Sequence, residues 1–264
     1  MLKNGPLALA FNALVVAFVL APLVVVCLVA FTPASTLSIP IHDFSLRWFR
    51  ALFAHSDFMQ SFRNSLLLAT LSATLAVCLA LPAASAITRY KFPGRDLLNG
   101  LLLSPLMIPH LVLGVALMRF FALIGSAGSF TWLVASHVVV VTPYVLRLLV
   151  GSLTGFDRSV EHAALSLSAS RATVFFRVTL PLIIPGVFGG WLLAFINSFD
   201  ELTMSVFITA PSTITLPVRM YMYATESIDP MMAAVSATVI ALTAVAMLLL
   251  DRVYGLDRVL VGQR

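Results

Sequence analysis

Long uncharged, apolar runs alternate along the chain with short stretches that hold most of the charged residues. A lipid core about 30 Å thick is crossed by an α-helix of about 20 apolar residues, because lipid offers the backbone no hydrogen-bond partner. The pattern therefore predicts an all-α membrane protein with six transmembrane helices, in one domain over residues 1–264. The predicted spans lie at about residues 7–31, 65–87, 97–118, 131–152, 178–201 and 230–250.

Composition excludes a soluble globular protein. Of the 264 residues, 60% are hydrophobic and 10% are charged, whereas soluble domains carry about 25% charged residues. Charges this scarce cannot cover a water-facing surface. The first apolar run is also longer than the about 7 to 15 apolar residues of a cleavable signal peptide. We therefore expect it to be retained as the first span.

The basic residues predict the orientation of the chain. An even number of spans puts both termini on one side, and Lys and Arg accumulate in cytoplasmic loops. All but five of the 16 Lys and Arg residues fall on the side of the termini, which are therefore predicted to be cytoplasmic. This asymmetry accounts for the net charge of +5, so no nucleic-acid partner is expected. The five exceptions are Arg47, Arg50, Arg63, Arg119 and Arg219.

The cysteines and histidines inside the predicted spans give no metal-binding pattern. Cys27 and Cys78 lie in the first two spans without ligand spacing, which favours apolar packing. His110 and His137 lie in the third and fourth spans, where we expect each to make one interhelical hydrogen bond rather than relay protons. No cofactor is predicted.

One predicted cytoplasmic loop, residues 154–177, is much longer than the connection between two helices requires. Its first part is rich in Ala and Leu and predicts a short helix, and Ser170 is a suitable N-cap for a second one. Leu165, Val174 and Phe175 would then form an apolar face that fits neither lipid nor water. Such a face indicates a protein partner.

The loop also holds the string E-x-A-A-x-x-L-x-A-S, followed by L-P at Leu180 and Pro181. This motif resembles the EAA loop of inner-membrane permease subunits of binding-protein-dependent ABC importers. The residues of the loop that correspond to the motif region are Glu161, His162, Ala163, Ala164, Leu167, Ser168, Ala169 and Ser170. Further segments resemble the spermidine/putrescine branch of that family, namely Asn64-Ser65, Pro105 with Pro109, Ser198-Phe199-Asp200-Glu201 and Leu216-Pro217.

The resemblance implies the MetI-like permease fold and a non-catalytic transport subunit in the bacterial inner membrane. In that family the loop forms coupling helices that insert into a cleft of a cytoplasmic ATPase. A chain with six helices would form half of the pathway, so it would pair with a second permease subunit, an ATPase dimer and an external solute-binding protein. The chain contains no Walker A motif, so ATP hydrolysis would belong to the ATPase.

Two positions depart from the family pattern. Ser168 stands where the family usually has Gly, at the turn between the two short helices, and Ser in a left-handed conformation costs roughly 1 kcal/mol. His162 stands where the family has Glu, and the acid lies one residue earlier, at Glu161. Glu161 is still the best candidate for a polar contact with the ATPase. The alternative is a solvated acid beside Arg158.

The second candidate site lies at the outer end of the fifth span. Offsets of three and four residues place Asn197, Asp200 and Glu201 near one helix face, and acids at the edge of lipid are costly unless they face a polar cavity. We expect the two acids to present negative charge to a cationic substrate, with Trp191 nearby, rather than to cap this helix. Alternatively, they contact neighbouring helices or a sister subunit, Arg119 being one partner.

Three classes of function are compatible with a membrane protein of this composition. The first is the ABC importer subunit, for which a polyamine is the first-choice substrate and phosphonates, opines or ferric iron are the alternatives. The second is a stand-alone ion-driven carrier or channel, which would not need the long loop. The third is a membrane-embedded hydrolase, for which the sequence lacks a G-x-S-x-G or H-E-x-x-H pattern.

Overall fold

A computed structural model describes residues 5–36 and 43–254, and every regular element in these ranges is helical. Spatial grouping of the residues gives two compact units, which are described separately. Of the described residues, the first comprises those up to 60 together with 219–249, and the second comprises 61–218 with 250–254.

The first unit contains α1 (Pro6–Val29), the amphipathic α2 (Arg47–Ala54), the start of α3 (Ser56–Arg89), most of α11 (Leu216–Glu226) and most of α12 (Met231–Tyr254). Asp57 at the start of α3 forms an ion pair of 3.3 Å with Arg219 of α11. The hydroxyl of Tyr223 donates a hydrogen bond of 2.6 Å to Asp229. Burial and this carboxylate raise the pKa of Tyr223 to about 12.

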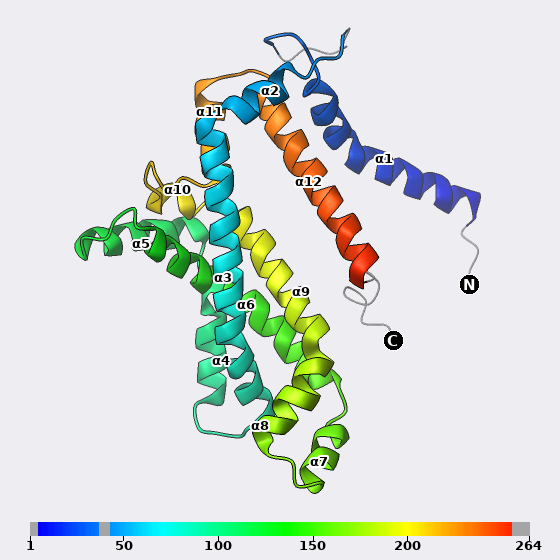
Figure 1. Ribbon diagram of the computed structural model, residues 1–264, viewed down its shortest axis with the longest axis vertical. Helices are drawn as coiled ribbons and strands as arrows, with labels where there is room; N and C mark the ends of the chain where they lie inside the picture. Colours follow the sequence, from blue (N-terminus) through cyan, green and yellow to red (C-terminus); the bar gives the residue numbers. More distant parts are fainter. Residues whose placement is uncertain (1–4, 37–42, 255–264) are drawn as a thin grey trace. The chain divides into compact units, whose positions relative to one another are not determined.

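The second unit holds the remainder of α3 and the elements up to the start of α11 (Figure 1). They are α4 (Arg95–Leu103), η1 (Ser104–Met107), α5 (His110–Leu123), α6 (Phe130–Gly155), α7 (Ser159–Ser166), α8 (Arg171–Val174), the π-helix η2 (Phe175–Thr179), α9 (Leu180–Phe199) and α10 (Ser205–Ile208).

Small residues let the central helices of this unit pack closely. Buried alanines follow one face of α3, and Val145, Leu149 and Ile183 of α6 and α9 pack in the same core. Gly186 of α9 lies so close to α6 that a Cβ atom there would stand 1.9 Å from the Oγ atom of Ser152. Close approach at small residues is typical of helix pairs in membranes. The alanines of the α3 face are Ala73, Ala76, Ala80 and Ala84.

The third predicted span is not one helix. The expected continuous segment 97–118 is divided between α4 with η1 and α5, and the two parts are bent by 100°. Pro109 explains the break, because it lacks a backbone N–H and forces the preceding Ile108 into an extended conformation, with φ −93° and ψ 124°. Five long apolar helices and this bent pair together correspond to the six predicted spans.

Candidate functional site

The 154–177 loop folds as two short helices, α7 and α8, as its sequence predicts. The Oγ atom of Ser170 accepts a hydrogen bond of 3.1 Å from the backbone N–H of Thr173, so Ser170 is the N-cap of α8. Asp157 precedes the N-cap of α7, Arg158, and its carboxylate accepts bonds from the hydroxyl and the backbone N–H of Ser159. Both hydrogen bonds lower the pKa of Asp157.

Ser168 forms the turn between the two helices in a left-handed conformation. Its φ angle is 64°, and it is the one non-glycine residue with a positive φ in the described ranges. A side chain in this conformation is strained, because its Cβ atom approaches the following carbonyl oxygen. The turn therefore keeps the backbone geometry that favours Gly, although the residue is Ser.

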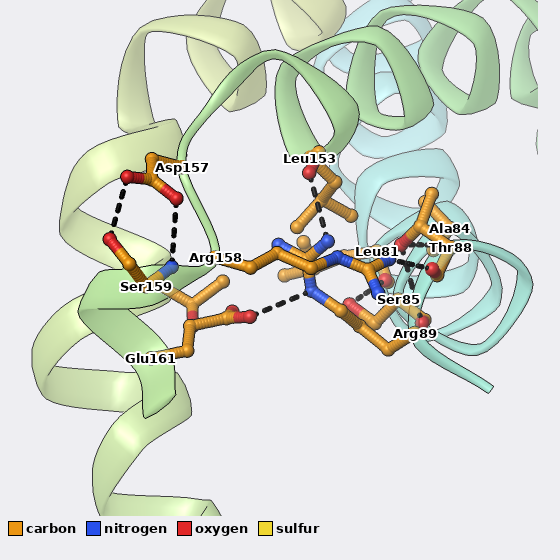
Figure 2. Close-up of polar contacts among 11 residues, drawn as sticks. Leu81, Ala84, Ser85, Thr88, Arg89, Leu153, Asp157, Arg158, Ser159 and Glu161 are labelled. Carbon is orange, nitrogen blue, oxygen red and sulfur yellow. Dashed lines mark hydrogen bonds and ion pairs between the residues drawn. The ribbon is translucent and has the colours of Figure 1, made fainter. Parts of the chain in front are cut away.

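Glu161 points into the chain rather than into solvent beside Arg158. Its Oε2 atom lies 3.1 Å from Nε of Arg89 at the end of α3, and its Oε1 atom accepts a hydrogen bond of 2.6 Å from the hydroxyl of Thr179 in η2. Figure 2 shows the carboxylate of Glu161 directed at Arg89, while Arg158 donates to the carbonyl oxygen of Thr88. Sequence reasoning missed Arg89, because nothing local connects it to the loop.

The apolar surface of the loop differs from the predicted one. Val174 is buried and Phe175 is half-buried, so these two side chains pack inside the chain. Leu165 remains exposed as predicted, and Leu167 (85% exposed) and Phe176 (65%) join it. The other motif residues lie around this surface: His162, Ala163, Ser170 and Pro181 are exposed, while Ala164, Ala169 and Leu180 are half-buried.

The acidic end of α9 also differs from the prediction. The helix ends at Phe199, so Asn197, Asp200 and Glu201 do not share one helix face. Asp200 is exposed, whereas Glu201 is buried and lies 2.6 Å from Nδ1 of His110. Glu201 also accepts a bond of 2.7 Å from the backbone N–H of Met204, and so supports the turn before α10.

The remaining polar groups at this end hold helices together. Asn197 donates a hydrogen bond of 2.8 Å to the carbonyl oxygen of Leu193 within α9. His137 of α6 makes two hydrogen bonds rather than the single one expected, to Oγ of Ser198 at 2.8 Å and to Oγ of Ser205 at 3.0 Å. His137 thereby connects α6 with α9 and α10.

Four aromatic rings stack along one side of α9 and lead to Asp200. The ring centroids of Phe188, Trp191, Phe195 and Phe199 follow one another at 6.4, 5.4 and 6.0 Å, with interplanar angles of 18° to 21°. Nε1 of Trp191 donates a hydrogen bond of 3.1 Å to the hydroxyl of Thr74 on α3. We call these four residues the aromatic ladder.

A family model described as "binding-protein-dependent transport system inner membrane component" matches residues 76–256. The chain therefore belongs to this family of transport permeases. It is a multi-pass protein of the bacterial inner membrane and a permease subunit of an ABC importer.

Curated relatives of similar length match most of the chain. The spermidine/putrescine transport system permease protein PotC of Escherichia coli (strain K12) is 29% identical over 94% of this chain and 93% of its own length. The PotC protein of Haemophilus influenzae is 33% identical over 76% and 78%. The putrescine transport system permease protein PotI of Escherichia coli (strain K12) is 30% identical over 84% and 82%. The chain is thus similar to the spermidine/putrescine branch.

Solved structures agree on the fold. A bacterial ABC transporter involved in alginate import has a chain that matches with a TM-score of 0.76 at 13% identity, covering 94% of this chain and 95% of that one. The MetNI methionine ABC transporter matches with a TM-score of 0.59 at 16% identity, covering 78% and 96%. At these identities the likeness shows the permease fold.

Proposed function

We propose that this chain forms half of the pathway through which an ATP-driven importer carries a polyamine across the inner membrane. A protonated polyamine is a chain of methylene groups between ammonium groups. The observation that carries the proposal is the exposed carboxylate of Asp200, which follows the aromatic ladder at the end of α9. Aromatic faces attract both cations and methylene groups, and the carboxylate attracts the ammonium. The names of the three polyamine permeases above support this assignment.

The two acids have different roles in this proposal. Glu201 is buried and its carboxylate is paired with His110, so it holds the structure around Asp200. Asp200 is exposed and supplies the negative charge. An anionic substrate such as a phosphonate would be repelled by that charge. The polyamine is therefore favoured over the phosphonate.

The 154–177 loop is the proposed docking surface for a cytoplasmic ATPase dimer. Its exposed apolar side chains are Leu165 on α7, Leu167 in the turn after α7 and Phe176 in η2. One loop serves one ATPase subunit, so a second permease subunit supplies the other loop. ATP hydrolysis takes place on the ATPase, and a solute-binding protein delivers the substrate from the opposite side. A stand-alone carrier would have no use for such a surface.

The substrate is tested with the reconstituted assembly of permeases, ATPase and binding protein. We expect polyamines to stimulate ATP hydrolysis, and phosphonates and other anions to have no effect. Asp200→Asn should raise the polyamine concentration for half-maximal uptake by about 5- to 30-fold, which corresponds to a loss of 1 to 2 kcal/mol. Asp96→Asn removes an exposed acid at the start of α4 and serves as the control. Unchanged uptake by Asp200→Asn in an intact assembly would remove Asp200 from the path.

The docking surface is tested separately by co-purification of the ATPase with the permease. Leu167→Ser should reduce the amount of bound ATPase, because Leu167 is the most exposed apolar side chain of the surface. Leu97→Ser changes a similarly exposed leucine on α4 and should leave ATPase binding unchanged. Equal ATPase binding by both variants contradicts the assignment of the surface.

A further inference from the structure

Arg89 connects three segments that are far apart in the sequence. It is the last residue of α3, and its Nη1 atom donates a hydrogen bond of 2.9 Å to the carbonyl oxygen of Leu153 near the end of α6. Its Nε atom lies 3.1 Å from the carboxylate of Glu161 on α7. The guanidinium carbon stands 4.8 Å from the ring centroid of Phe156, which follows α6. The ends of α3 and α6 are thus joined to α7 by one side chain (Figure 2).

Glu161 extends this connection to α9. While Oε2 faces Arg89, Oε1 accepts the hydrogen bond from Thr179, the last residue of the π-helix η2. The π-helix continues directly into α9. A single π-helical turn is rare and is frequently found at functional sites. The carboxylate therefore joins the start of α7 to the start of α9, as well as to α3.

Arg89 and Glu161 are largely buried charges, and each is the other's ionic partner. The side chains of Arg89 and Glu161 are each 14% exposed, so a charge left there without its partner is poorly solvated. The neighbouring charges have other partners: Arg158 donates to Thr88, and Asp157 accepts from Ser159. To reach an ATPase, the carboxylate of Glu161 would first have to leave both Arg89 and Thr179.

We propose that Arg89, Glu161 and Thr179 form a coupling clamp, which makes α7 move together with the ends of α3, α6 and α9 when the ATPase moves. Arg89 and Glu161 are then positioning residues for transport: they transmit movement of the docked loop to the helices of the pathway without contacting the ATPase. The proposal rests on the proposed docking of the ATPase on the 154–177 loop.

If the clamp is correct, its variants should lose the coupling of ATP hydrolysis to substrate uptake but keep the ATPase bound. In the complete reconstituted assembly, Glu161→Gln and Arg89→Gln should each keep the ATPase bound and hydrolysing ATP. The number of substrate molecules taken up per ATP hydrolysed should fall by about 5-fold or more, the lower end of measured coupling free energies. The defect of the double variant should be smaller than the sum of the two single defects, because both substitutions remove the contact between Arg89 and Glu161.

Two further variants separate positioning from general destabilisation. Arg147→Gln removes an exposed cation of α6 that is not one of the clamp residues, and it should keep the wild-type uptake per ATP. Arg89→Lys retains the charge without the planar guanidinium, so it should give an intermediate value. If the Gln variants do not assemble, Arg89→Lys and Glu161→Asp are compared instead, and wild-type uptake per ATP in both overturns the clamp.

The outcomes distinguish the clamp from the docking proposal. If Glu161→Gln releases the ATPase while Arg89→Gln retains it, Glu161 contacts the ATPase and the clamp is wrong. Additive defects of the two single variants also contradict the clamp. If Leu167→Ser leaves ATPase binding unchanged, the docking surface is wrong, whatever the clamp variants show.

Discussion

The imidazole of His110 and the carboxylate of Glu201 lie 2.6 Å apart although 91 residues separate them in the sequence. His110 is the first residue of α5, directly after the break at Pro109, and Glu201 follows the end of α9. Because Glu201 also accepts the N–H of Met204, one carboxylate holds α5 and the turn before α10 together. The bent third span is fixed in this way.

Removal of this contact should destabilise the protein. His110→Ala should lower the free energy of unfolding by about 1 to 3 kcal/mol, because it leaves the buried carboxylate of Glu201 without this partner. Glu201→Gln should lower it less, because an amide oxygen can still accept a hydrogen bond. Thermal unfolding of the detergent-solubilised chain measures the effect. Asp200→Asn, at the neighbouring exposed acid, should leave the unfolding temperature unchanged. Equal stability of His110→Ala and wild type would show that the contact adds nothing.

Substitution of Ser168 tests the strained turn between α7 and α8. Ser168→Gly relieves a left-handed strain of about 1 to 2 kcal/mol but increases the entropy of the unfolded chain by about 0.4 to 1 kcal/mol. We therefore expect stability between unchanged and about 1.6 kcal/mol higher, with ATPase coupling kept or improved. Substrate-stimulated ATP hydrolysis and thermal unfolding measure the two properties.

Ser168→Val is the opposite test of the same turn. A β-branched residue with a φ of 64° is a strong outlier, so this variant should lose stability and coupling. If Ser168→Val behaves like wild type, the left-handed turn is not required. Poor transport by Ser168→Gly at normal expression would contradict the expectation that Gly is tolerated at this turn.

The close contact between α6 and α9 should tolerate no methyl group at Gly186. Its Cβ atom would meet Ser152, so Gly186→Ala should cost about 1 to 3 kcal/mol through overpacking. Gly189→Ala is the matched control, because no atom lies within 4 Å of the added Cβ. Ser152→Gly should restore part of the stability of Gly186→Ala. Unfolding temperatures of the three variants test the packing, and equal values for Gly186→Ala and Gly189→Ala contradict it.

Asn64 holds the segment before α11 against α3. Its Nδ2 atom donates hydrogen bonds of 3.0 and 2.9 Å to the carbonyl oxygens of Ser212 and Ile214. Asn64→Asp should be more destabilising than Asn64→Ala, because a carboxylate would face two carbonyl oxygens as well as lacking the donor. Thermal unfolding of both variants provides the comparison. A more stable Asp variant would mean that the amide orientation is wrong.

Local features of the fold were predictable. The apolar runs predict the helices that cross the membrane, since the length of a span is fixed by the thickness of lipid. The N-cap at Ser170 was also predictable, because it depends on residues three positions apart. The 100° bend was not, although Pro109 is visible in the sequence, because proline marks a kink without setting its angle.

The candidate sites were predictable as segments but not as contacts. The position of the 154–177 loop and of the two acids after α9 followed from the sequence. The sequence did not show that α9 ends at Phe199, which separates exposed Asp200 from buried Glu201. It also did not show that Val174 is buried while Leu167 is exposed, because this depends on how α8 packs on the rest of the chain.

The sequence by itself determined the class of protein, the number of apolar segments and the place of the long loop, because hydrophobic length and capping chemistry are local properties of the chain. Only the tertiary structure decided that Glu161 pairs with Arg89 and Glu201 with His110. Partners so distant in the sequence are selected by the packing of helices. The hydrophobic pattern of a single helix or loop does not specify how the helices pack against one another.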